Sequence, residues 1–83
     1  MTERRRAVPA DAAQLTVLNQ FLREFGSAVA LDAAQLQTFE LALEEIFMNI
    51  VMHGSKPGGT PLVEVLLHRA AESVTMTVED DGP

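Results

Sequence analysis

The 83-residue sequence has no cysteine, no tryptophan and no tyrosine. Without cysteine the chain has no disulfide scaffold, no thiol nucleophile and no cysteine-ligated zinc site. No apolar run approaches the ~18 residues that span a bilayer. Arg4, Arg5 and Arg6 are followed by no continuous apolar stretch, so they do not begin a signal peptide. These absences predict a cytoplasmic protein without a membrane segment.

Basic residues are also scarce, with six against 12 acidic residues and a net charge of −6. From residue 24 onward, ten acidic residues accompany only two basic ones. Such a surface repels phosphate backbones, so we expect no direct nucleic-acid binding. A solvated terminus is the simplest interpretation of Arg4, Arg5 and Arg6, and contact with a phosphate or an acidic partner is the alternative.

Helical spacing of apolar residues predicts one small domain, 1–83, with two helices. The first helix is predicted over 11–25, with Asp11 as its N-cap and Gly26 as its stop. The second is predicted over 33–53, between Asp32 and Gly54. Its predicted core face contains Leu36, Phe39, Leu43, Ile46, Phe47 and Ile50. An apolar strip away from that face contains Leu41, Met48, Val51 and Met52.

Alternating apolar and polar residues predict a hairpin of strands 62–69 and 74–79 with one buried face. Residues 4–9 are predicted to form a short strand or arm that ends at Pro9. The expected fold is therefore α+β, an incomplete two-layer sandwich in which a hairpin lies under two helices. A two-stranded hairpin leaves an open sheet edge, so we expect a further segment or a second chain to complete the sheet.

Polar residues interrupt the apolar second helix at Glu45, Asn49 and His53, which are four residues apart and share one stripe. We place this stripe beside the core face, where an amide and a carboxylate are costly to desolvate without partners. One interpretation makes Asn49 a ligand for Mg²⁺ and Glu45 a group that orients water or accepts a proton. The alternative is that Glu45 and Asn49 bond each other or cap a loop. His53 suits the C-terminus of a helix and receives no definite role.

A second polar group, Asp80 and Gly82, directly follows the last predicted strand. An Asp at a strand end can point a carboxylate into a pocket while a nearby Gly lets the backbone approach a ligand. Because Asp-Gly is also a common turn dipeptide, a plain turn is the alternative.

The two polar groups together resemble one family. Residues 45–53, beginning Glu45-x-x-x-Asn49, resemble the N box of the Bergerat-type (GHKL) ATPases, and residues 78–83 resemble the start of their Asp-x-Gly-x-Gly box. Glu44 beside Glu45, His53 before Gly54, and the Gly-Pro ending are similar to the bacterial anti-sigma factor serine/threonine kinases. The resemblance covers nearly the whole chain and about the first two thirds of the family's domain.

The resemblance implies a role for each matching residue in a domain that binds ATP with Mg²⁺. Asn49 is implied as the Mg²⁺ ligand that bridges to the phosphates, and Glu45 as the general base of phosphoryl transfer. Asp80 is implied to accept a hydrogen bond from the adenine amino group. Gly82 is implied to let the backbone pass close to the base.

The same resemblance implies a kinase that phosphorylates a STAS-type anti-sigma antagonist, sequesters a sigma factor and forms a homodimer. The second glycine of the box and the later glycine-rich box do not occur up to Pro83, so we expect this chain alone not to form a complete ATP pocket. Two alternatives stay open: a catalytically incomplete binding or dimerisation module of the same fold, and the ATP-binding domain of a sensor histidine kinase.

Overall fold

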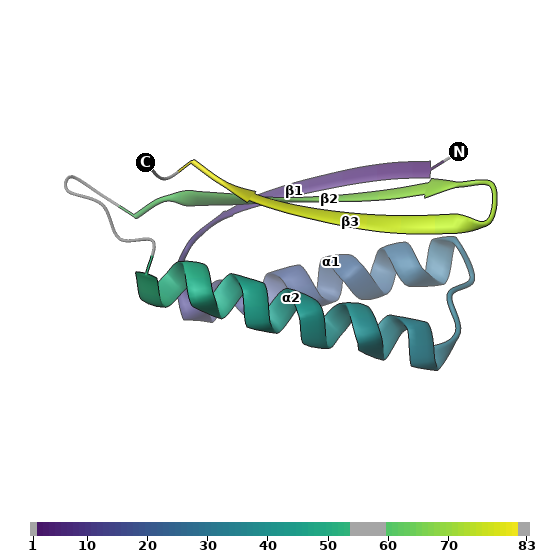
Figure 1. Cartoon of the computed structure of the whole chain (residues 1–83), viewed down its shortest axis with the longest axis horizontal. Coiled ribbons are helices and arrows are strands. Elements are labelled where there is room, and N and C mark those ends of the chain that lie inside the picture. Colours follow the sequence, from purple (N-terminus) through teal and green to yellow (C-terminus); the bar gives the residue numbers. More distant parts are fainter. Residues whose placement is uncertain (1, 54–59, 82–83) are drawn as a thin grey trace.

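Two helices cover one face of a three-stranded antiparallel sheet in the computed structural model, which describes residues 2–53 and 60–81 (Figure 1). This arrangement confirms the predicted α+β, two-layer architecture. In chain order the elements are β1 (Thr2–Pro9), a 3-10 turn (Ala12–Gln14), α1 (Leu15–Ala28), α2 (Ala33–His53), β2 (Leu62–Ala70) and β3 (Ser73–Asp80).

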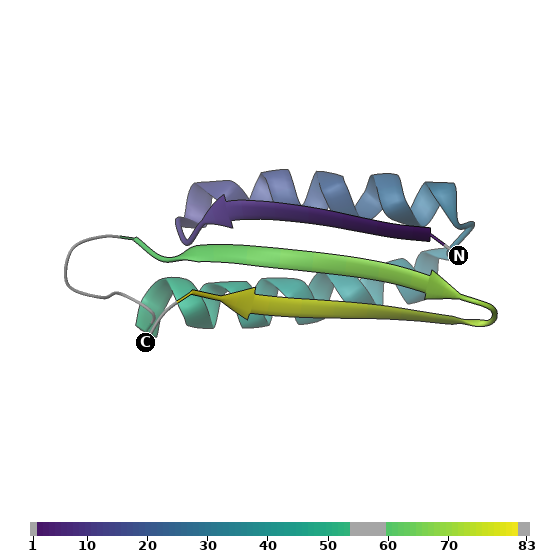
Figure 2. The same cartoon turned by 90° about the horizontal axis from the view of Figure 1, so that it is seen from above.

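The sheet has the order β1-β2-β3, with β2 at its centre. The predicted hairpin is confirmed as β2 and β3, and the predicted N-terminal strand pairs with the other side of β2. Val63, Val65 and Leu67 alternate along β2 and are fully buried against the helices. In Figure 2, α1 runs along the β1 side of the sheet and α2 along the β3 side.

Helix α1 begins and ends later than predicted, because residues 12–14 form a 3-10 turn and the α-helix starts at Leu15. The predicted cap Asp11 accepts a hydrogen bond from the Ala13 N–H at 3.0 Å, which caps the 3-10 turn that precedes α1. Gly26 was expected to stop the helix, but the helix continues to Ala28. The stop is instead made by Ala30, whose φ of 58° is left-handed. The Leu31 N–H then donates to the Gly26 carbonyl at 2.9 Å, which closes the helix end.

Gly26 lies inside α1 and is buried. A Cβ atom at this position would lie 3.3 Å from the Leu36 Cδ1 atom of α2. This spacing is tighter than ordinary van der Waals contact, so glycine here permits close helix packing. The glycine thus has a packing role in place of the predicted terminating role.

Helix α2 has the predicted bounds. Asp32 and Gln35 cap its start reciprocally, because the Gln35 N–H donates to Asp32 Oδ1 at 2.8 Å and the Asp32 N–H donates to Gln35 Oε1 at 3.3 Å. Leu43 and Phe47 are fully buried at the centre of its core face. The predicted C-terminal residue Gly54 lies outside the described residues.

The two long sides of α2 differ from the prediction at three apolar positions. Met48 and Val51 were placed away from the core, but they are partly buried and pack against it. Val51 lies about three turns from Glu40, which pairs with α1, so it is on the side that α1 covers. Ile46 was placed in the core, but it lies on the opposite side and is 41% exposed.

Candidate functional site

The carboxylate and amide of the predicted site lie on the solvent side of α2. Glu45 and Asn49 are one helical turn apart and both are exposed. Their predicted place beside the core face, in apolar surroundings, is therefore wrong. Glu45 is two residues from each of Leu43 and Phe47, which puts it on roughly the opposite side of the helix from the core. Neither side chain is removed from water on folding, so the desolvation penalty expected from the sequence does not arise.

Within residues 2–53 and 60–81, Glu45 and Asn49 make no hydrogen bond or ion pair, to each other or to a third residue. Of the open alternatives, mutual bonding and loop capping are thus absent from the described structure. Two polar side chains that form no bond to the described residues are available for a ligand.

Both side chains border one shallow, open depression of about 540 Å³ on α2. Its lining consists of Leu41, Glu44, Glu45, Met48 and Asn49. Apolar, carboxylate and amide groups therefore meet on a single helix surface. Sequence analysis did not assign Glu44 to the site, although its position next to Glu45 was a usable signal.

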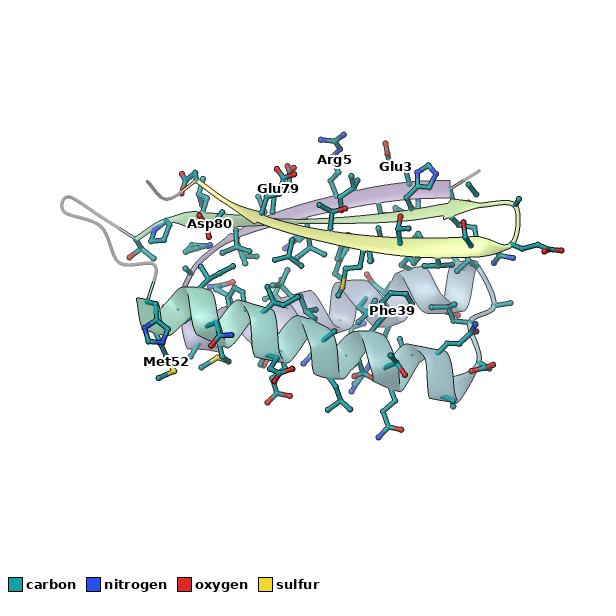
Figure 3. All side chains as sticks on the ribbon, viewed as in Figure 1. Glu3, Arg5, Phe39, Met52, Glu79 and Asp80 are labelled. Atoms are coloured by element: carbon teal, nitrogen blue, oxygen red, sulfur yellow. The ribbon has the colours of Figure 1, made fainter. Side chains whose placement is uncertain are left out.

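Asp80 is the last residue of β3 and is exposed. It pairs in register with the buried Val63, so its side chain is on the helix-facing side of the sheet. Figure 3 shows Glu79 on the other side of the sheet, away from the helices. The strand alternation thus directs Asp80, and not Glu79, toward the helix layer.

The neighbouring Asp81 closes the end of the β2–β3 ladder. Its carboxylate accepts a hydrogen bond from the Leu62 N–H at 2.7 Å, and its own N–H donates to the Leu62 carbonyl at 3.1 Å. This pair of bonds fixes the point at which β3 ends. Asp81 therefore has a structural role that positions Asp80, which sequence analysis missed because two aspartates stand side by side.

The structure brings the parts of the predicted site to one end of the molecule without joining them in one depression. The C-terminal ends of α2 and β3 lie at the same end in both views (Figures 1 and 2). Asp80 borders a separate depression of about 260 Å³, together with Ala7, Leu62, Glu64, Glu79 and Asp81. Gly82, the remaining predicted residue, lies outside the described residues.

The positions of two other polar residues, His53 and Arg69, indicate structural roles. His53 is exposed in the last turn of α2, the end of a helix at which histidine is favoured. Arg69, which no motif had placed, donates from Nη1 to the Val29 carbonyl and from Nε to the Ala71 carbonyl at 3.3 Å. Arg69 thereby connects the β2–β3 hairpin to the C-terminal end of α1.

The side chains at the candidate site can bind a metal ion only when another molecule supplies most of its ligands. Among the described residues, no group of three or more His, Asp or Glu side chains could hold an ion by itself. Asn49 offers one amide oxygen on an exposed helix surface. Mg²⁺ is often bound through one or two protein groups, with phosphates and water as its other ligands. The residues present therefore fit Mg²⁺ carried by a nucleotide.

Comparison with known proteins shows the family to which the chain belongs. No helix within the described part of the chain is long and apolar enough to cross a membrane. No curated protein and no solved structure matches the sequence significantly. The family model of the histidine kinase-like ATPase domain matches residues 8–83, which include Glu45, Asn49 and Asp80. Domains of this kind bind ATP together with Mg²⁺. The chain therefore belongs to the histidine kinase-like ATPase domain family.

Proposed function

We propose that the chain is the ATP-binding part of an anti-sigma factor serine/threonine kinase. The observation that carries the proposal is the exposed Glu45–Asn49 pair, one turn apart and unengaged within the described residues. A carboxylate and an amide at this spacing supply a proton acceptor and a Mg²⁺ ligand on one surface. Family membership supports ATP binding, and the subgroup motifs around Glu45 and His53 support the kinase class.

In this proposal Asn49 holds the metal and Glu45 takes the proton. Bound Mg²⁺ neutralises negative charge on the phosphates. Glu45 accepts the proton of a serine or threonine hydroxyl as the hydroxyl oxygen attacks the γ-phosphorus and the bond to the ADP oxygen breaks. Its exposure on α2 leaves room for a protein substrate to approach.

Asp80 selects the base in the same proposal. Its place on the helix-facing side of β3 supports a hydrogen bond from the adenine amino group to its carboxylate. Gly82, two residues further on, would let the chain pass close to the ring.

The proposed partners follow from the subgroup resemblance. They are a STAS-type anti-sigma antagonist as phosphoryl acceptor, a sigma factor that is sequestered, and a second copy in a homodimer, all in the cytoplasm. Exposed apolar side chains beside Glu45 support a protein partner at this surface, because Leu41 and Met52 are 60% and 67% exposed. The same side chains equally favour the second candidate function, a binding or dimerisation module without catalysis.

A calorimetric titration with ATP and Mg²⁺ tests the nucleotide half of the proposal. We compare the parent chain with Asn49→Ala and with Gln37→Ala, which removes another exposed amide from the same helix. Asn49→Ala is expected to weaken binding by at least about tenfold, the loss of roughly 1.4 kcal/mol. Gln37→Ala is expected to bind like the parent. Equal affinity of all three chains would show that Asn49 does not hold the Mg²⁺ that accompanies ATP.

Phosphoryl transfer from ATP to a STAS-type protein tests the catalytic half. Glu45→Gln is expected to slow transfer by about 10²–10⁴-fold, as removal of a general base does. Glu72→Gln removes an exposed carboxylate from the turn between β2 and β3, outside the depression that Glu45 borders, and is expected to have little effect. Transfer that persists in Glu45→Gln would refute the base assignment. Transfer to a histidine would favour the sensor kinase alternative, and sigma-factor binding without transfer would favour the binding module.

A further inference from the structure

Strand β1 forms an edge of the sheet on the side away from the predicted nucleotide site. It is eight residues long and pairs with β2 on one side only among the described residues. The other side of an edge strand presents backbone N–H and C=O groups that can pair with an extended segment of another chain.

The edge is strongly basic. Arg4 and Arg6 lie opposite the buried Leu67 and Val65 in register, so their side chains are on the helix side of the sheet. Both are exposed, and neither makes an ion pair within the described residues. Arg5 points away from the helices (Figure 3), with its Nη1 atom 3.7 Å from Glu64 Oε1.

These charges select the kind of segment that can pair. A second β1 strand laid antiparallel on this edge and centred on Arg5 would place Arg5 against Arg5 and Arg4 against Arg6, and like charges directly opposite are destabilising. An acidic segment would instead meet uncompensated guanidinium groups on its helix side. The charge pattern therefore disfavours this symmetric β1 pairing and favours an acidic partner strand.

A groove beside the edge adds a place for one apolar side chain. The groove has a volume of about 370 Å³ and lies between Arg6 and the flank of α1 that faces away from α2. Its remaining lining is Thr16, Val17, Gln20, Phe21 and Glu24. Val17 and Phe21 are half-buried. Figure 2 shows α1 running along β1 on this side of the sheet.

We propose that the β1 edge and this groove bind an extended acidic segment of a partner protein. Backbone hydrogen bonds to β1 hold the segment, and its carboxylates meet Arg4 and Arg6. Because side chains alternate along a strand, every second residue of the segment points toward α1, and one apolar residue enters the groove over Val17 and Phe21. This function does not depend on nucleotide binding.

The test uses a short fluorescent peptide in which a central Leu is flanked on each side by two Glu and then a Thr. Binding to the full chain is followed by fluorescence anisotropy. Arg6→Glu is expected to weaken binding by about tenfold. Arg23→Glu carries the same charge change on the α2 side of α1, where Arg23 pairs with Glu40, and is expected to change affinity by less than about twofold. Replacing the peptide Leu by Ser is also expected to weaken binding.

A second variant keeps the test decisive if Arg6→Glu does not fold. Gln20→Glu adds a carboxylate to the groove at an exposed position and removes only the exposed 3.4 Å hydrogen bond from Gln20 Nε2 to Glu24 Oε2, and it is expected to weaken peptide binding. Asn49→Ala is expected to bind the peptide like the parent, which separates this proposal from the nucleotide site.

Three results would overturn the proposal. The first is the absence of binding at millimolar peptide. The second is backbone amide shifts, in a nuclear magnetic resonance titration, that lie away from β1 and the groove. The third is concentration-dependent dimerisation, measured by light scattering, that Arg6→Glu abolishes, because the occupant of the edge would then be a second copy.

Discussion

The two sides of α2 contrast sharply within a few residues. Leu43 and Phe47 are 0% exposed and anchor the helix to the sheet and to α1. Glu45 and Asn49 are exposed on the other side and contribute no bond to the described fold. The helix therefore has the residues that stabilise the fold on one side and the proposed site residues on the other, so changes on one side should leave the other intact.

The largest expected effect comes from the buried side. Phe47→Ala removes a fully buried ring at the centre of the core and is expected to lower the free energy of unfolding by about 3–5 kcal/mol. Chemical denaturation followed by circular dichroism measures the loss. Met52→Ala, on the exposed side, is the control and should cost less than about 0.5 kcal/mol. Similar losses of unfolding free energy for both variants would contradict the difference between the buried and exposed sides of α2.

A smaller effect of opposite sign on the free energy of unfolding is expected in the turn between α1 and α2. Ala30 is exposed and holds a left-handed φ of 58°. Ala30→Gly removes that strain, and we expect thermal unfolding to show a gain of about 0.5–1 kcal/mol. The control is Ala28→Gly, in the last turn of α1 with no such φ, which should destabilise the chain. A loss at Ala30 would mean that the closing turn is not strained.

The ion pair between the helices should matter little. Arg23 Nη2 lies 2.9 Å from Glu40 Oε2, and the two side chains are 60% and 24% exposed. Solvent screens such a pair, so Glu40→Gln is expected to cost about 0.5 kcal/mol, with less loss in high salt. A loss above about 2 kcal/mol in urea denaturation would show that packing of the two helices depends on this charge pair.

The smallest effect on folding is expected on the exposed side itself. Neither Asn49→Ala nor Glu45→Gln removes a bond of the described fold, so each should shift the free energy of unfolding by less than about 0.5 kcal/mol. Thermal melts without nucleotide measure this shift. A clear destabilisation would show that the pair supports the fold after all.

The sequence predicted those elements whose signals are local. Asp32 and Gln35 indicate the start of α2, and the alternation of apolar and polar residues indicates β2 and β3. The end of α1 was missed because Gly26 is a good stop residue, yet it was needed for close packing against Leu36. That requirement depends on where α2 lies, which no local pattern contains.

The roles of the predicted site residues stay a prediction, and the structure corrects only their surroundings. The four-residue spacing found Glu45 and Asn49, but the wheel of one helix does not show which flank a second helix covers. Met48 is therefore packed and Ile46 is exposed, the reverse of the prediction. Asp81 was missed for a similar reason, since only the register of β3 shows that it bonds Leu62 while Asp80 turns toward the helices.

The most direct test of the account is a nuclear magnetic resonance titration of the ¹⁵N-labelled chain with ATP and Mg²⁺. We predict amide shifts at the turns of α2 that carry Glu45 and Asn49 and at the end of β3 beside Asp80, with the amides of β1 unchanged. Shifts confined to β1 and the α1 groove, or no shifts at millimolar nucleotide, would contradict the claim that the exposed side of α2, which carries Glu45 and Asn49, binds nucleotide.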